Sequence, residues 1–514
     1  MERLNLPPEL LTAILLDLDF RDLLRCRQVN TTFKTLIDKD VRAQYKIELA
    51  VAGMTDGPPS TLTPAERLTI LRARQDAWDN LVWTAKDDVT MHQGGVWELY
   101  GNVLAQAQGD RTLHFKQIPS QIRGIRGTEW TIPNVGCKIR DFGMDPAQDL
   151  LVVIEHFWHR PQLTVRIHLK SLSTGAPHPA GPQAGMVTYD PKPSGYSYAI
   201  QTSEGYLGIH MSSQGEDASE LLIWEWRTGR LHLHITGPEL SSFAFLSSRH
   251  LLLGVQPALE LNEEDLVQGP NNPLLVVIDL ESTTSATPVE FSDLDYVCAF
   301  HYPTLSDTFI VVAMSVRSDP APYWRPNPAL PVPFSVSHED RLFVVTLWVM
   351  EGNVPLGVLS LVPASTLLNA LSSLEPGVVR RDFAWDEWGP EGSRLMSMPG
   401  RQSAVWVCYV YGTTYALWGN DHGERAVYTL DFNQLAIRRA LARGAADDIA
   451  DRPMVFKPAR MFKEQVRTAL PYRARKLASL PEGENRFEAV MVAEDAVVLV
   501  SSQSHIRRYC VLSF

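Results

Sequence analysis

The first fifty residues predict three short helices that carry more apolar side chains than they can bury among themselves. A proline at the first helical position begins the first helix, because its missing N–H is not needed there. Asp19 and Asn30 can cap the second and third helices with their side-chain oxygens. Spacings of three and four residues align apolar side chains along one stripe of a helix. These are Leu10, Leu11, Ile14, Leu15 and Leu18 in the first helix and Phe33, Leu36 and Ile37 in the third.

This apolar surface is large for so small a unit. Full burial of one such side chain is worth roughly 1.5–3 kcal/mol, so Leu, Ile and Phe at this density predict a partner surface. The partner is either another protein or the rest of this chain, on which the helices would pack as a cap.

The pattern of this segment resembles the F-box family in Leu6-Pro7, Ile14-Leu15, Leu23-Leu24, Val29 and Phe33. The resemblance implies a helix cluster that docks onto the SKP-type adaptor of cullin-RING ubiquitin ligases. Many family members have Cys at the position of Asn30 and Trp at that of Phe33, and the residues present here are expected to keep the geometry and soften the contact. The adaptor-binding residues that it implies are Leu6, Pro7, Leu10, Ile14, Leu15, Leu23, Leu24, Val29, Phe33 and Ile37.

The helical pattern continues through Gln44–Ala50, Gly53-Met54, Asp56-Gly57 and Glu66-Arg67-Leu68 to Trp78. This segment resembles a set of fungal F-box proteins. Thr63, Pro64 and Glu66 form a helix-start signature, with Thr63 and Glu66 as a capping box. We therefore expect F-box helices over residues 1–50, a helical linker over 51–88 and a large all-β domain over 89–514, an α+β multidomain chain.

Composition sets the broad class. The 514 residues are 45% hydrophobic and 21% charged, which is typical of a globular protein with a large core. No apolar run approaches eighteen residues and no leader pattern opens the chain, so we expect an intracellular protein, cytoplasmic or nuclear, that does not bind membranes. Five scattered cysteines favour reduced thiols, and a net charge of −12 disfavours nucleic-acid binding.

From about residue 90 the hydrophobic period changes to two, and short apolar runs come in pairs. Leu151–Ile154 is followed by Thr164–Leu169, and Ala404–Val407 by Ala426–Leu430. Thr-Gly turns after the second run, as at Gly175 and Gly229, supply the positive φ of a tight turn.

This repeat is typical of propeller blades, and the second runs near residues 97, 166, 223, 277, 345, 428 and 509 predict seven. An eighth blade would need strand pairs inside the two widest gaps between these second runs, which are 345–428 and 428–509. A final strand over 509–514 is suited to closing the ring. A pair of β-sandwiches is the alternative fold.

Two insertions carry candidate target-binding residues. The loop around Tyr323 and Trp324 is dense in proline, and either packs across the ring or presents a binding edge. A basic run between Lys457 and Lys476 includes Arg473 and Arg475. Clustered arginines can hold a phosphorylated peptide by charge-assisted hydrogen bonds, and the alternative is a solvated basic helix before Pro471.

Signals for catalysis, cofactors or metals are weak. The chain has no phosphate-binding loop, dinucleotide fingerprint, nucleophile elbow or zinc helix. The pairs His156 with His159 and His232 with His234 have no third ligand nearby in the sequence, so we expect neither a metal nor a cofactor.

We therefore expect a non-catalytic substrate receptor of an SCF-type ubiquitin ligase, whose propeller recruits a target that is phosphorylated or unmodified. Two alternatives are a hydrolase-like enzyme on a propeller scaffold, with carboxylates around the central channel, and an adaptor-binding scaffold that degrades nothing.

Overall fold

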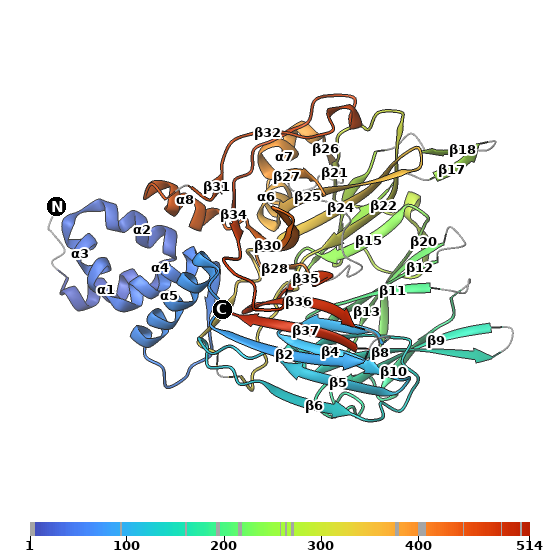
Figure 1. Ribbon diagram of the computed structural model, residues 1–514, viewed down its shortest axis with the longest axis horizontal. Coiled ribbons are helices and arrows are strands. Elements are labelled where there is room, and N and C mark those ends of the chain that lie inside the picture. Colours follow the sequence, from blue (N-terminus) through green and yellow to red (C-terminus); the bar gives the residue numbers. More distant parts are fainter. Residues whose placement is uncertain are drawn as a thin grey trace.

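The chain folds into a cluster of short helices at its amino end and a ring of β-sheets that the remaining chain builds (Figure 1). The structure is a computed structural model. It describes residues 6–514 except 93–94, 160–161, 192–195, 214–217, 257–258, 263–264, 269–271, 331, 376–379, 399–407, 446, 485 and 504–505.

Four helices form the amino-terminal cluster, and side-chain caps begin three of them. Asp19 accepts hydrogen bonds from the N–H groups of Arg21 and Asp22, and Asn30 accepts one from Phe33, which confirms both predicted caps. Each cap satisfies donors that have no partner inside the helix. Asp40 caps the fourth helix in the same way. The helices are α1 (Pro8–Asp17), α2 (Phe20–Val29), α3 (Thr31–Lys39) and α4 (Val41–Val51).

A linker of one strand and one helix follows. Helix α5 (Pro64–Asn80) has the predicted capping box between Thr63 and Glu66. Strand β1 (Met54–Asp56) pairs with β23 (Phe334–Val336), which lies far along the chain in the propeller. The linker is therefore hydrogen-bonded to the ring as well as covalently joined to it.

The ring is a seven-bladed β-propeller, as predicted. Its first three blades contain four strands in chain order, and the third gains β20 (Ser285–Glu290) in parallel at its edge. Blade 1 is β3 (Trp97–Tyr100), β4 (Val103–Gln108), β5 (Thr112–Gln117) and β6 (Thr128–Ile132). Blade 2 is β7 (Asp141–Asp145), β8 (Leu150–His159), β9 (Gln162–Ser171) and β10 (Met186–Tyr189). Blade 3 begins with β11 (Tyr196–Ser203), β12 (Tyr206–Ser213), β13 (Ser219–Glu225) and β14 (Arg230–Thr236).

The next three blades carry the insertions. Blade 4 is β15 (Leu240–Phe245), β16 (His250–Val255), β19 (Leu274–Asp279) and β21 (Cys298–His301), with β26 (Arg381–Phe383) at its edge. Blade 5 is β22 (Phe309–Arg317), β24 (Leu342–Glu351), β25 (Val354–Pro363) and β27 (Arg394–Ser397). Blade 6 is β28 (Val410–Tyr411), β29 (Thr414–Asp421), β30 (Glu424–Asp431), β34 (Tyr472–Lys476) and β31 (Ile449–Ala450).

The seventh blade closes the ring with strands from opposite regions of the sequence. It joins β35 (Ala489–Val492), β36 (Ala496–Gln503) and β37 (Ile506–Ser513) to β2 (Ala85–His92). The β2–β37 ladder runs from Ala85 opposite Ser513 to His92 opposite Ile506. Pairing both edges in this way removes an exposed strand edge. The propeller thus begins at Ala85, slightly before the predicted boundary at residue 89.

The two widest gaps hold helices and short strands. The helices are α6 (Ala364–Ser372), α7 (Trp385–Gly392) and α8 (Gln434–Ala442). The second gap also holds η3 (Ala459–Met461) and the hairpin of β32 (Met454–Val455) with β33 (Arg467–Thr468). Elsewhere in the chain, the short elements are η1 (Pro146–Gln148), η2 (Phe291–Asp293) and the hairpin of β17 (Leu259–Asn262) with β18 (Asp265–Gln268). Among the described residues, neither gap contains an eighth blade.

The predicted strand pairs are mostly the second and third strands of their blades. Leu151–Ile154 lies in β8 and Thr164–Leu169 in β9, while the innermost strand β7 went unrecognised. Strand β7 (Asp141–Asp145) carries Asp141 and Asp145 toward its two ends and lacks a long apolar run, so the period-two pattern did not reveal it. The predicted run Ala404–Val407 lies outside the described residues. Apolar cores fill the spaces between neighbouring blades, as between blades 2 and 3.

Candidate functional sites

Three apolar side chains stay exposed on α1 and α2. Leu10 and Ile14 lie four residues apart on one side of α1, and each is 52% exposed. Val29 at the end of α2 is 66% exposed. Pro7 is also exposed, while Leu6, Leu24 and Phe33 are half-buried. The propeller strands do not cover these side chains, so the surface expected from the sequence is open.

Three of the residues predicted to contact an adaptor lie instead inside the helical cluster. Leu15, Leu23 and Ile37 are buried and pack with Ala43 into one core. Leu15 lies on the side of α1 opposite the exposed pair because helical periodicity turns successive residues by about 100°. These three side chains hold the helices together, which leaves a narrower surface for a partner than the sequence predicted.

The predicted phosphate site is not formed, because its two arginines are already paired. Arg473 and Arg475 are two residues apart on β34, so their side chains lie on the same face of the strand. There both form ion pairs with Asp79 of α5 and with Asp448. The four nitrogen–oxygen distances are 2.6–3.2 Å, and both side chains are mostly buried. The alternative of a basic helix before Pro471 is also wrong, since this segment contains η3 and β33. The arginines fasten α5 to blade 6.

The proline-dense loop packs across the ring. Trp324 is buried, with its ring edge-on to Tyr100 and Tyr411 at centroid distances of 6.5 and 6.4 Å. Tyr323 stays exposed and stacks on His338 at 5.0 Å. Of the two predicted target-binding residues in this loop, Trp324 is therefore a packing residue and Tyr323 alone reaches the surface.

A cavity of about 220 Å³ lies in the central channel and is lined by the innermost strands. Glu98 on β3, Asp141 on β7 and Asp319 after β22 contribute carboxyl groups from three blades. Burial raises the pKa of Glu98 to about 8 and the pKa values of Asp141 and Asp319 to about 6. Arg317 lines the same cavity.

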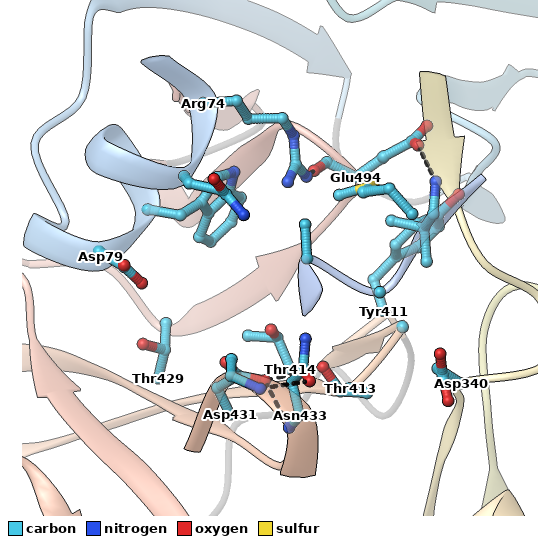
Figure 2. Close-up of a pocket in the computed structure, with 18 of the residues that line it drawn as sticks. Arg74, Asp79, Asp340, Tyr411, Thr413, Thr414, Thr429, Asp431, Asn433 and Glu494 are labelled. Atoms are coloured by element: carbon cyan, nitrogen blue, oxygen red, sulfur yellow. Dashed lines mark hydrogen bonds between the residues drawn. The ribbon is translucent and has the colours of Figure 1, made fainter. Parts of the chain in front are cut away.

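A smaller cavity of about 100 Å³ lies between the helical linker and blade 6. Figure 2 shows Arg74 and Asp79 on the side of α5, facing Thr414 and Asp431 of blade 6 across the hollow. The Asp431 carboxylate accepts a hydrogen bond from the Thr413 hydroxyl at 2.7 Å. A space of this size holds water rather than a larger ligand.

The histidine pairs do not form metal sites among the described side chains. His232 hydrogen-bonds with the Leu280 carbonyl at 2.7 Å, whereas His234 pairs with Glu220 at 3.1 Å. His156 hydrogen-bonds with the hydroxyl of Tyr198, and the side chain of His159 lies outside the described residues.

One group in the described part of the chain has metal-like spacing: Asp88, Glu484 and Cys510. Arg508 already forms ion pairs with Asp88 at 2.8 Å and Glu484 at 2.7 Å. Because these carboxylates are neutralised within the chain, the group gives no reason to expect a metal ion.

Comparison with known families decides the nature of the helical cluster. Residues 3–44 match the F-box domain family, a span that covers α1, α2, α3 and the start of α4. The chain carries an F-box. F-box domains typically bind SKP-type adaptors within cullin-RING ligases. No curated protein matches the chain in sequence.

The solved structures that align with this F-box protein are distant from it in sequence. The WD40 domain of SCAP from fission yeast is 8% identical, with a TM-score of 0.35, over 84% of this chain and 98% of that one. An oligogalacturonate lyase in complex with manganese is 10% identical, with a TM-score of 0.37, over 83% of this chain and 91% of the lyase. Drosophila Semaphorin 2a is 8% identical, with a TM-score of 0.33, over 83% of this chain and 74% of that one. Similarity at this level does not indicate a shared function.

A buried ion cluster joins the F-box linker to the propeller. Arg74 of α5 pairs with Asp495 at 3.0 Å, and Arg123 of blade 1 pairs with Glu494 at 2.9 Å and also with Asp495. All four side chains are buried. The Glu494 carboxylate also accepts a hydrogen bond from the Val336 N–H at 2.6 Å, next to the β1–β23 pair. Removal of one partner from such a cluster costs about 3–5 kcal/mol, so the cluster holds the F-box linker in one position on the ring.

Sequence reasoning missed this cluster, and it named no residues for the channel carboxylates of the enzyme alternative. Glu494 and Asp495 lie in the turn between two apolar strands, and that turn was the only local signal. Their partners Arg74 and Arg123 lie more than 370 positions away. In the described part of the F-box protein, no helix is both long and apolar enough to cross a membrane.

Proposed function

We propose that this chain is the substrate-receptor subunit of an SCF-type cullin-RING ubiquitin ligase, acting in the cytoplasm or nucleus. The F-box binds the SKP-type adaptor, and the propeller recruits a target protein for ubiquitination. F-box proteins are generally non-catalytic subunits of such complexes. Their contribution to the rate is proximity, because the target is held near an activated ubiquitin carrier.

The observation that carries the proposal is the uncovered apolar surface of the F-box. Leu10, Ile14 and Val29 remain exposed while the other end of the helical region docks on the propeller through α4 and α5. Exposed apolar side chains at this density are typical of protein–protein contact sites. Burial of each against an adaptor would contribute roughly 1.5–3 kcal/mol.

Co-purification with a SKP-type adaptor tests this function. We expect the wild-type chain to retain the adaptor and the double variant Leu10→Asp, Ile14→Asp to lose it. Because both side chains are exposed, this variant keeps a folded F-box, whereas a charge at the buried Leu23 would unfold it.

Val354→Asp is the matched control, since Val354 is an equally exposed apolar residue on the propeller. This control should bind the adaptor like the wild type. Retention of the adaptor by the Leu10, Ile14 double variant would contradict the proposed function.

A further inference from the structure

Two cavities follow one another along the central channel. One of about 740 Å³ touches Ser197 near the start of β11 and Val312–Ser315 on β22. The channel cavity of about 220 Å³ touches Tyr198–Thr202 and Arg317–Asp319, which come later on the same two strands. The larger cavity therefore lies near the earlier positions of these two strands, and the smaller cavity lies near their later positions.

The narrow end is closed on the F-box side. Ala321 of the proline-dense loop lines the cavity and donates a hydrogen bond from its N–H to the Tyr100 hydroxyl at 3.0 Å. The same loop continues into β23, which pairs with β1 of the linker. The large cavity lies toward the starts of β11 and β22, on the side of the ring away from the F-box.

The charged groups at the narrow end have no ion-pair partners among the described residues. Glu98, Asp141 and Asp319 form no salt bridge, and Arg317 forms none either, whereas Glu494 and Asp495 nearby are fully paired. The Asp141 carboxylate accepts one hydrogen bond, from the Phe142 N–H at 2.9 Å. Charged groups with little access to solvent are normally paired in proteins, so carboxyl groups from three blades beside one cation leave room for a further positive charge.

A second observation points to a ligand in the same cavity. Ser318 lines it, is only 8% exposed, and has a hydroxyl with no hydrogen-bond partner in the described structure. A buried polar group without a partner costs free energy, which an incoming donor would recover.

The arrangement selects an extended organic cation over a metal ion. In the described part of the chain, Asp88, Glu484 and Cys510 are the one set of three with metal-like spacing, and the channel carboxylates do not form such a set. Rings of Trp97, Tyr100 and Tyr198 line the cavity beside the carboxylates. Aromatic faces with carboxylates attract ammonium and guanidinium groups, which sit on long apolar stems in Lys and Arg.

We propose that the channel cavity binds the end of a lysine or arginine side chain that a target protein inserts through the large cavity. This inference rests on the proposed function, because it names the feature by which the receptor recognises its target. It also replaces the phosphorylated target that the basic run suggested, since Arg473 and Arg475 are paired within the chain.

Fluorescence anisotropy with labelled tetra-arginine and tetra-lysine peptides tests the proposal on the full-length chain. We expect saturable binding of at least one basic peptide and at least a tenfold loss of affinity in the double variant Glu98→Gln, Asp319→Asn. Glu375→Gln is the matched control, because it removes a negative charge from an exposed site and should leave affinity unchanged.

Two further probes test whether the cavity prefers a peptide to a free polyamine and whether binding requires positive charge. Spermidine, a free polyamine, should compete more weakly than the unlabelled peptide, and tetra-glutamate should not bind. Absence of basic-peptide binding, equal binding by the double variant, tighter binding of spermidine, or binding of tetra-glutamate would each overturn the proposal.

Failure of this inference is distinguishable from failure of the proposed function. The channel variants leave the F-box unchanged, so they should retain the SKP-type adaptor and still unfold in one cooperative transition. Loss of adaptor binding by the wild type would contradict the ligase assignment without affecting the peptide result.

Discussion

At the residue scale, carboxyl groups with little access to solvent occur in two environments. Glu494 and Asp495 are held by arginines, whereas Glu98 faces Asp141 from β7, Arg317 and Asp319 from the end of β22, and Cys408. Burial without an ion pair disfavours the ionised form and raises the pKa of Glu98 to about 8 from its usual 4.5.

This raised pKa predicts a specific dependence of stability on pH. Between about pH 4.5 and pH 8 the folded chain holds a proton on Glu98 that the unfolded chain has released, so stability falls as pH rises through this range. Glu98→Gln removes this contribution. The difference in melting temperature, variant minus wild type, should therefore increase as the pH is raised from 5 to 8.5.

Glu375→Gln provides the reference, because its exposed carboxyl should give a difference from wild type that does not change with pH. Parallel melting curves for Glu98→Gln and the wild type would show that Glu98 titrates normally.

Residue-scale features were predictable where their causes are local. The caps at Asp19, Asn30 and Thr63 act on N–H groups within three positions, so sequence spacing alone identified them. The Arg74–Asp495 pair joins residues 421 positions apart, and no local pattern can reveal it.

At the element scale, short helices depend on their caps. Helix α3 has nine residues, too few to be stable alone, and the Asn30 side chain satisfies the Phe33 N–H at 2.7 Å. Asn30→Ala should lower the local stability of α3 by about 1 kcal/mol. Hydrogen exchange of the α3 amides should then become about fivefold faster.

Thr32→Ala is the control for this change. Thr32 is exposed in the same helix and alanine is a better helix former, so exchange should be unchanged or slower. Equal exchange in Asn30→Ala and the wild type would exclude a stabilising role for the cap.

Element types were predictable from period, but their places in the blades were not. Second and third strands are buried on both faces and read as apolar runs, while innermost strands such as β7 mix Asp141 with apolar residues because they line the channel. The basic run became strand β34 because its arginines are held by Asp79 and Asp448. That contact depends on how α5 docks, which charge patterning cannot show.

At the scale of the whole molecule, the F-box and propeller form one connected body. The β1–β23 pair, the ion cluster around Asp495 and the Arg475–Asp79 pair all join the linker to the ring. The blade count was predictable from the strand repeat. The closing strand β2 was not, since it crosses the boundary at residue 89 that was predicted between helical linker and propeller.

This connection predicts a single orientation of the F-box. Spin labels at Val29→Cys and Val354→Cys, in a Cys26→Ser background because the four other cysteines are buried, should give one narrow distance distribution by pulsed electron resonance. Arg67→Met with Arg74→Met removes the contacts of the linker to the Pro333 carbonyl and to Asp495 and should broaden the distribution.

Arg72→Met, an exposed change on the same helix, should leave the distribution narrow. A broad distribution in the wild type would contradict a fixed orientation.

Hydrogen exchange of the full-length chain with and without a purified SKP-type adaptor tests the central claim most directly. The account predicts slower exchange in α1 and α2, around Leu10, Ile14 and Val29, with no change in the innermost propeller strands. Unchanged exchange in both helices at saturating adaptor, or protection confined to the propeller, would contradict it.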